Sequence, residues 1–461
     1  MNRAVRRPLI ALVIATVVVG AWVLSPRVWA PAGPLAETAP SQAVHSEEAA
    51  TASAAPSAPA ATASADPAAT ASADPAATAS AAPQPSANPS SSPHPGIRSA
   101  TPMLRTALDA RLERLRAKYG IPGISAAVLF ADGSIWRGSA GLADVEAGRP
   151  VTSDTAFSVA SISKTFTAAL ILTLAEDGRL SLDSTARTYL PGLPIDRAIT
   201  VRQLLDHTSG LRDFYYHPRI DKALLSKPAV VWDAARSLSY VGKPHAQPGV
   251  SWHYSNTNYL VLGMLAEAVG RAPVADQLRD RFFTPLGLIH TYYQAVAQPR
   301  GPVARGYRFT GSNPTLPAID LSDGSQVVPF TSVVTASGAA GSIATNADDL
   351  AHWAQALYGG NAIDRASRDT MVADIVWTAR YRPAVSYGLG VQVIRVDGHL
   401  TLGHSGRFLG SSAAVRWLPD ERIAIAVLTN QSRTDPNVVL AALLKSGLQP
   451  QPDCLGCPAI P

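Results

Sequence analysis

Ser161 and Lys164 form a Ser-x-x-Lys pair, and Lys164 is the only one of six lysines with a serine three residues before it. Small and apolar residues recur at helical spacing over residues 161–177, and Gly178 can stop a helix, so the pattern predicts a helix here. Positions i and i+3 share a helix face, which brings hydroxyl and amine together at the first turn. A desolvated lysine amine can take the proton of a serine nucleophile. The spacing therefore predicts a nucleophile with its base, and an ordinary helix start is the alternative.

A second stretch with chemical side chains is Tyr254-Ser255-Asn256, which lies between a turn and an apolar helix pattern. Tyr254 and Asn256 are therefore expected at a helix start. A phenol beside a lysine ammonium has a lowered pKa and can act as a general base, while an asparagine amide can donate to a substrate carbonyl. Capping and packing are the alternative roles for both side chains.

A third stretch, His404-Ser405-Gly406, is expected to end a strand. A glycine on an edge strand lets a ligand backbone approach closely. The N–H of the next residue, Arg407, is the expected partner of the Ser161 N–H in an oxyanion hole. A simple turn between strands is the alternative.

Other motifs carry less chemistry. His207 is better explained by a helix end before a glycine than as a catalytic base, and Asp348-Asp349 by a helix start than by a metal site. The chain contains no G-x-S-x-G, H-E-x-x-H or G-x-x-x-x-G-K-[ST] pattern.

Composition and charge exclude several classes of protein. The 461 residues carry a net charge of +5 without a dense Lys/Arg run after the first eight residues, so nucleic-acid binding is not expected. The two cysteines, Cys454 and Cys457, both lie near the C-terminus. The fold therefore cannot depend on an internal disulfide framework.

The first 100 residues differ sharply from the rest. Residues 1–8 carry three arginines and residues 9–24 form an uncharged apolar run, so residues 1–30 predict export by a cleaved signal peptide or a retained membrane anchor. Residues 31–100 are rich in Ala, Ser, Pro and Thr, with an eight-residue repeat, and predict a disordered tether of about 200 Å. We expect an extracytoplasmic protein, with possible membrane contact at its N-terminus. Residues 449–461 are expected to form a loose tail.

The folded part is expected to be α/β, with strands at both ends and helices between them. A helix over 103–118 and a hairpin of 124–130 with 134–140 open it, and a helical, loop-rich region follows from about 183 to 380. Strands at 387–396, 400–404, 411–417 and 423–428 precede a last helix at 436–446. This order predicts one sheet, assembled from both termini, with an inserted helical subdomain.

The order and spacing of the three stretches resemble the serine β-lactamase and penicillin-binding protein family. The similarity is greatest to its class C and D-alanyl-D-alanine carboxypeptidase branch. Further stretches at 204–211, 285–288 and 340–350 also look like the family's, and the resemblance covers about residues 103–446.

The resemblance implies an α/β fold (an α+β sandwich) with an antiparallel sheet for a hydrolase domain over 101–448, and two-step acyl transfer ended by water. It implies no metal or organic cofactor. The implied roles are Ser161 as nucleophile, Lys164 and Tyr254 in proton transfer, Asn256, His404, Ser405 and Gly406 in substrate binding, and the N–H groups of Ser161 and Arg407 as oxyanion donors.

One departure from the family pattern bears on the substrate. Class C lactamases carry Lys-Thr-Gly at the third element, whereas this chain has His404. Histidine is less reliably cationic at neutral pH, which weakens the binding of a β-lactam carboxylate. A D-Ala-D-Ala carboxypeptidase acting on peptidoglycan peptides is therefore favoured. A β-lactamase, a small-ester esterase and a non-catalytic penicillin or peptidoglycan sensor or scaffold are the alternatives.

Overall fold

The computed structural model describes residues 99–309, 319–373, 375–378 and 385–448. The expected signal or anchor, nearly all of the expected tether, and the tail with its two cysteines lie outside the described residues. Within the described ranges, no helix is both long enough and apolar enough to cross a lipid bilayer.

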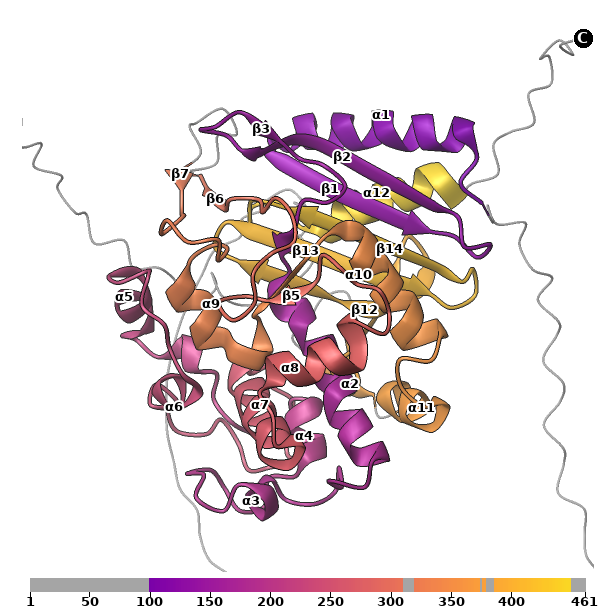
Figure 1. Ribbon diagram of the computed structural model, residues 1–461. Helices are drawn as coiled ribbons and strands as arrows, with labels where there is room; N and C mark the ends of the chain where they lie inside the picture. The colour runs from indigo at the N-terminus through magenta and orange to yellow at the C-terminus, as the bar shows by residue number, and fades with distance from the viewer. Residues whose placement is uncertain (1–98, 310–318, 374, 379–384, 449–461) are drawn as a thin grey trace, which may run out of the picture. The chain divides into compact units, whose positions relative to one another are not determined.

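A nine-stranded antiparallel sheet forms the centre of the fold, in the order β3-β2-β1-β14-β13-β12-β11-β10-β9 (Figure 1). The first hairpin pairs with the last strand, with Ile124 opposite Thr429, so the predicted sheet from both termini is confirmed. The strands are β1 Gly123–Leu129, β2 Ile135–Asp144, β3 Arg149–Pro150, β9 Val376–Thr378, β10 Val385–Tyr387, β11 Gln392–Val396, β12 His399–Phe408, β13 Ser411–Leu418 and β14 Ile423–Thr429.

Two strands near the site differ from expectation. The expected strand at 387–396 is broken into β10 and β11 at Gly388 to Gly390. Gly390 has φ +78°, and a Cβ on it would lie 2.5 Å from Ala168 Cβ, so only glycine fits this turn against the nucleophile helix. Strand β12 runs on to Phe408, so the His404-Ser405-Gly406 element lies inside a strand and does not end one.

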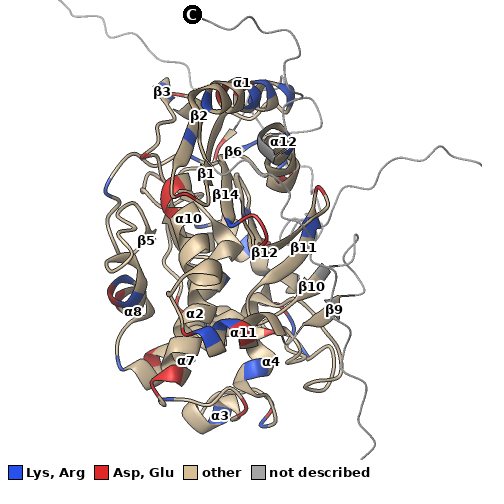
Figure 2. Ribbon diagram, turned by 90° about the vertical axis from the view of Figure 1, so that its right-hand side faces the viewer, with Lys and Arg blue, Asp and Glu red and all other residues tan. Residues whose placement is uncertain are grey.

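The sheet is covered on both faces (Figure 2). Helices α1 (Pro102–Lys118) and α12 (Pro436–Leu448) pack on one face, where Leu108 and Leu440 belong to the same buried cluster. Helices α2 (Ser163–Glu176) and α10 (Ala347–Ala354) cover the other face. Alternate residues of β1 enter the two clusters, which explains why this strand is apolar throughout.

The inserted helical region lies between the two halves of the sheet in sequence and packs around α2 (Figure 1). Most of its helices are short and end at glycines, prolines or polar caps. The helices are α3 Ala186–Tyr189, α4 Val201–Leu205, η3 Phe214–Tyr216, α5 Ile220–Leu225, α6 Ala234–Leu238, α7 Asn256–Gly270, α8 Val274–Leu278, η4 Arg279–Phe283, α9 Thr331–Ser337, η5 Gly338–Ala340, η6 Gln355–Gly359 and α11 Arg365–Ala373. The short strands outside the central sheet are β4 Phe157–Ser158, β5 Tyr292–Tyr293, β6 Tyr307–Arg308, β7 Ile319–Asp320 and β8 Ile343–Thr345.

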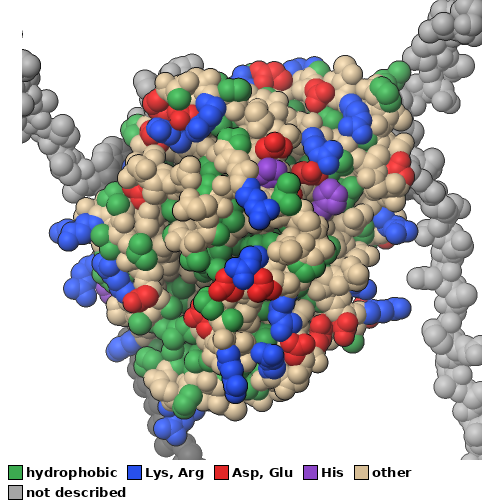
Figure 3. Space-filling view, viewed as in Figure 1, with side chains coloured by type: hydrophobic (Ala, Val, Ile, Leu, Met, Phe, Trp, Pro, Cys, Tyr) green, Lys and Arg blue, Asp and Glu red, His purple; other side chains and the backbone are tan. Residues whose placement is uncertain are grey.

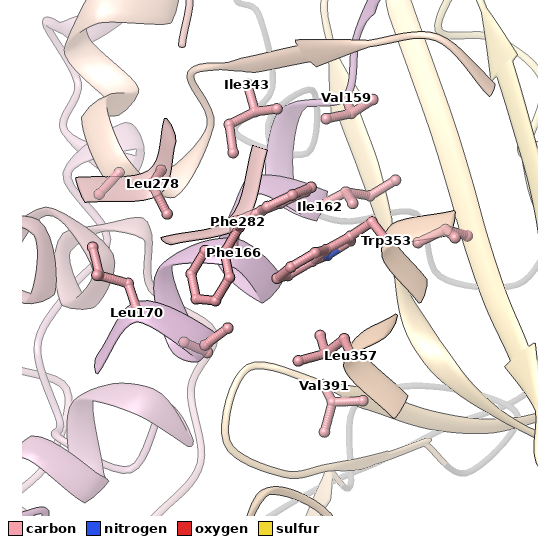
Figure 4. Packing of buried hydrophobic residues seen from close by; sticks show 14 of the residues in the cluster. Val159, Ile162, Phe166, Leu170, Leu278, Phe282, Ile343, Trp353, Leu357 and Val391 are labelled. Atoms are coloured by element: carbon pink, nitrogen blue, oxygen red, sulfur yellow. The ribbon is translucent and has the colours of Figure 1, made fainter. Parts of the chain in front are cut away.

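Helix α2 is held from both sides by aromatic packing (Figure 4). The Phe166 ring stacks on Trp353 with centroids 4.0 Å apart, and it meets the edge of Phe283 at 5.7 Å. The Trp353 indole also donates a hydrogen bond to Thr165 Oγ1 (2.9 Å). Twelve consecutive residues of α2, from Ser163 to Leu174, are buried, so the helix that carries Lys164 is fixed on every side.

Candidate active site

Ser161 lies in a single 3₁₀ turn, η2 (Ala160–Ile162), directly before α2. Strand β4 leads into this turn and pairs with β8, and the Val159 N–H donates to the Ile343 carbonyl (3.1 Å). Ala160 has φ +45°, a left-handed conformation that costs a non-glycine residue about 1–3 kcal/mol. The sharp turn presents a half-buried Ser161 at the start of the helix, where the sequence placed it.

Lys164 is fully buried and points at the nucleophile. Its Nζ lies 3.2 Å from Ser161 Oγ, 2.7 Å from Asn256 Oδ1 and 2.9 Å from the Ala340 carbonyl oxygen. Asn256 Oδ1 and the carbonyl can only accept hydrogen bonds. In a neutral amine they therefore bind both hydrogens and leave the lone pair facing Ser161, which is the geometry of a base.

The charge state of Lys164 suits this role. Burial lowers the pKa of Lys164 to about 7, and the nearby Asp213 carboxylate opposes part of this shift. A substantial fraction of the amine is therefore neutral near pH 7, whereas an ordinary lysine is almost fully protonated.

Asp213 fixes the orientation of Asn256. The Asn256 amide Nδ2 donates to Asp213 Oδ2 (2.7 Å), which leaves the Asn256 carbonyl oxygen for Lys164. Burial raises the pKa of Asp213, while the hydrogen bonds from Tyr215 and Asn256 and the charge of Lys164 oppose the rise. No sequence pattern indicates Asp213, which is buried on an irregular segment 43 residues before Asn256.

Tyr254 lies next to the amine, as the sequence suggested. Ser255 caps α7 and Asn256 begins it, so the expected helix start is present. The Lys164 Nζ is 5.0 Å from the centre of the Tyr254 ring, within the range of a cation–π contact. The structure thus joins Ser161, Lys164, Tyr254 and Asn256 in one cluster, and proton transfer by the phenol stays a prediction.

Strand β12 passes directly behind the nucleophile turn. A Cβ on Gly406 would lie 1.9 Å from the Val159 carbonyl oxygen and 3.2 Å from the Ser161 nitrogen, so this position requires glycine. The Ser405 N–H points toward β11, since it donates to Gln392 Oε1 (3.1 Å). Backbone N–H groups two residues apart on a strand point to the same side of it, so the Arg407 N–H also points to the β11 side of β12. The last residue of β12 paired with β11 in this direction is Gly403, opposite Gln392, so Arg407 lies beyond the end of that pairing. This arrangement is compatible with the expected oxyanion donors.

His404 and Ser405 are held by hydrogen bonds within the protein, and their expected role in substrate binding stays a prediction. The fully buried His404 donates from Nδ1 to the Ser405 carbonyl (2.7 Å), so its Nε2 accepts the Tyr387 hydroxyl (3.0 Å). Burial and the charge of Lys164 hold the pKa of His404 well below its usual range, so the ring is neutral. The Ser405 hydroxyl accepts hydrogen bonds from Arg416 Nη2 (2.8 Å) and Asn437 Nδ2 (3.0 Å). Neither side chain is hydrogen-bonded to the Ser161 cluster.

Comparison with known proteins agrees with this geometry. Residues 108–448 match the β-lactamase family. The chain belongs to the β-lactamase family. Its relatives include a penicillin-binding protein of Bacillus subtilis (29% identity, covering 71% of this chain and 72% of that protein) and penicillin-binding protein 4 of Amycolatopsis lactamdurans (29%, covering 69% and 84%).

Two solved structures share the fold of this chain. D-stereospecific amidohydrolase from Streptomyces sp. aligns with 27% identity and a TM-score of 0.63 over 74% of this chain and 98% of that one. D-amino acid amidase from Ochrobactrum anthropi SV3 with D-phenylalanine aligns with 25% identity and a TM-score of 0.66 over 75% and 98%. The predicted family and fold class are confirmed, and the chain is a serine hydrolase of this family.

The site geometry suits the two-step acyl transfer of a serine hydrolase. Lys164 Nζ is close enough to remove the Ser161 proton as Oγ attacks a substrate carbonyl, and we expect the N–H groups of Ser161 and Arg407 to bind the oxygen that becomes negative. Collapse of the tetrahedral intermediate expels the leaving group and leaves an ester on Ser161. Water then attacks this ester by the same route and regenerates the hydroxyl.

His207 holds Tyr254 in place, although its position before a glycine predicted only a helix end. The His253 N–H donates to the His207 carbonyl (3.0 Å) and the Ser255 N–H to His207 Nδ1 (3.2 Å), so both neighbours of Tyr254 are bound to it. The two rings of His207 and Tyr254 lie 4.3 Å apart. Burial holds the pKa of His207 well below its usual range, so this buried ring is neutral and acts as a positioning residue.

Two substitutions of His207 distinguish the contribution of its hydrogen-bond acceptor, Nδ1, from that of its ring packing. His207→Asn keeps an acceptor close to Nδ1, whereas His207→Phe keeps a ring and loses the acceptor. We expect His207→Phe to lower the acylation rate by about tenfold or more, because the segment that carries Tyr254 and Asn256 shifts, and His207→Asn to lower it less. Acylation by benzylpenicillin against pH, with melting temperatures measured in parallel, checks this. If both variants lose the same fraction of the acylation rate, and this loss parallels a lower melting temperature, His207 contributes only through packing.

Proposed function

We propose that this chain hydrolyses peptide bonds that follow a D-amino acid, as a D-alanyl-D-alanine carboxypeptidase-like enzyme acting on peptidoglycan peptides. The observation that carries the proposal is Lys164, whose two acceptors leave its lone pair facing Ser161 Oγ at 3.2 Å. The nucleophile, Ser161, and its base, Lys164, are both side chains of this protein. The penicillin-binding relatives support an acyl-enzyme, since penicillin acylates a serine of this kind.

A second candidate is an amidase or esterase for D-amino acid derivatives without a free carboxylate. The specific observation in its favour is His404, whose neutral ring uses both nitrogens within the protein. It therefore offers no positive charge to a substrate carboxylate, unlike a lysine at the same position. The similarity to a D-stereospecific amidohydrolase and a D-amino acid amidase supports this candidate.

Three matched peptides separate the candidates. The first ends in D-Ala-D-Ala, the second in D-Ala-D-Ala-amide, and the third in L-Ala-D-Ala. We expect hydrolysis after D-alanine and at least about 100-fold slower cleavage of the L-alanyl peptide, because the acyl group must fit one face of the oxyanion site. Faster cleavage of the free acid supports the carboxypeptidase, and equal or faster cleavage of the amide supports the second candidate. Cleavage of none of the three, with wild type equal to Ser161→Ala, would contradict both.

We also propose that the chain acts outside the cytoplasm, tethered by residues 31–100. The basic and apolar start of the sequence and the tether-like composition that follows support this proposal, and a peptidoglycan substrate agrees with it. Fractionation of cells that express the full chain, with immunodetection of the hydrolase domain, checks the location. Detection in the cytoplasm alone would contradict it.

A further inference from the structure

A basic surface lies on the helical region beside the active site. Residues 212–243 carry six exposed Lys and Arg side chains, whereas Asp233 is the one exposed acidic residue of this stretch. Lys and Arg side chains gather along the left edge of the molecule, over α5 and α6 (Figure 3). The six residues of the basic surface are Arg212, Arg219, Lys222, Lys227, Arg236 and Lys243.

Contacts among neighbours join much of this stretch into one surface. Arg219, Lys222 and Tyr240 line a hollow of about 430 Å³ together with two serines, Ser226 and Ser239. The Tyr240 ring lies 5.3 Å from Trp232, and the Arg236 guanidinium lies 4.0 Å above that indole. Cations, hydroxyl groups and an aromatic ring thus converge on one hollow, a combination that suits acidic groups.

In the part of the chain that the structure describes, none of the six forms an ion pair with a carboxylate. Elsewhere arginines are paired with carboxylates, as the exposed Arg279 is with Asp276 (2.5 Å) and the half-buried Arg202 is with Asp183 (2.7 Å). Unpaired like charges held close together raise the local potential, and an anionic ligand relieves it.

The same segment enters the active site. Arg212 directly precedes Asp213, which orients Asn256, and its side chain lies against Gly242, where a Cβ would be 3.2 Å from Arg212 Cδ. The next residue, Phe214, donates its N–H to Thr257 Oγ1 (3.0 Å) in α7. Residues 212–214 therefore join the basic surface to the active site along the chain.

We propose that the basic surface binds the carboxylates of an acidic peptide substrate whose D-alanyl end occupies the Ser161 site. This inference rests on the proposed function and adds a charge preference to it. The basic surface raises the affinity and association rate of the acidic peptide. It does not change the rate of the chemical step at Ser161, because it does not alter the acylating groups.

Two acetylated hexapeptides test the proposal with the full chain. Both end in Gly-D-Ala-D-Ala, and they begin with three glutamates or three glutamines. Their affinities for Ser161→Ala are measured by fluorescence anisotropy, and their kcat/KM values with active enzyme. We expect the glutamate peptide to be favoured by about tenfold at low ionic strength, and the preference to fall at about 0.5 M salt because charges in solution are then screened.

Paired substitutions locate the effect. Arg219→Gln with Lys222→Gln should reduce the preference for the glutamate peptide to about twofold, while benzylpenicillin still acylates Ser161 at the wild-type rate. Arg114→Gln with Lys118→Gln on α1 removes the same charge from the far side of the sheet and should change neither value.

The outcomes separate this inference from the proposed function. Equal affinities of the two peptides for the wild-type surface, or an equal loss in the α1 control, would overturn the basic surface as a peptide site. Absence of any Ser161-dependent acylation or hydrolysis, with the glutamate preference retained in binding, would overturn the proposed function and leave the surface supported.

Discussion

Ser161→Ala should abolish the covalent adduct with benzylpenicillin and lower hydrolysis of any substrate by about 10⁴-fold or more. The reason is chemical, since the acyl group is carried by Ser161 Oγ, which lies 3.2 Å from Lys164 Nζ. Intact-mass measurement of the protein after incubation with the drug checks the result. A long-lived adduct on the wild type supports a penicillin-binding hydrolase, and drug turnover without a lasting adduct supports a β-lactamase.

Ser181→Ala is a suitable control for this experiment. Ser181 is exposed on the loop after α2, and its hydroxyl only accepts a weak bond from the Asp183 N–H (3.4 Å). We expect it to react like the wild type. An adduct of equal mass and rate on Ser161→Ala would place the nucleophile elsewhere and contradict the site, and reaction of neither protein would turn the search to small esters and to a sensor or scaffold role.

The local part of the site could be predicted from the sequence because its geometry is local. Ser161 and Lys164 are one helical turn apart, so their spacing alone brought them together. Tyr254 and Asn256 could be placed at a helix start for the same reason, from the turn residues before an apolar helix pattern. Their approach to Ser161 followed only from the family resemblance, since no local pattern determines which helix starts meet.

The groups that set the chemistry of Lys164 are distant in sequence and could not be predicted. The Ala340 carbonyl is 176 residues away, and any residue type could supply it. Asp213 is a buried carboxylate on an irregular segment, and only its contact with Asn256 reveals its role. The packing around His404 was also missed, because both of its ring nitrogens are occupied by partners that no spacing rule indicates.

Strand lengths were predicted less well than strand order. The order of strands and helices along the chain predicted one sheet assembled from both termini, and β1 and β14, which pair in it, are buried along their whole length. The end of β12 was placed too early because Gly406 looks like a turn residue. In the structure Gly406 is needed inside the strand, where any side chain would strike the Val159 carbonyl.

Lys164→Met should lower the acylation rate by about 10³-fold while keeping the fold. Methionine has a similar length and no charge, so it fills the buried position next to Tyr254 and Tyr259 but cannot take the Ser161 proton. Lys164→Arg should also be inactive, because a guanidinium stays protonated. Lys445→Met, at an exposed ion pair on α12, is the matched control and should react normally. Rapid-quench measurement of the benzylpenicillin adduct gives the rates.

The pH dependence distinguishes a base from a structural lysine. Because the neutral amine is the active form and the pKa of Lys164 is about 7, the acylation rate should rise with pH and level off above about pH 7. The charge of Asp213 raises that pKa, so Asp213→Asn should move the rise to lower pH, whatever its effect on the maximal rate. Another group would take the Ser161 proton if the acylation rate did not change between pH 5 and pH 9. The same conclusion would follow if Asp213→Asn left the pH at which the rate rises unchanged. Tyr254 would then be the base, because its ring lies 5.0 Å from the same amine and its phenol is the remaining titratable group of the cluster predicted to transfer a proton.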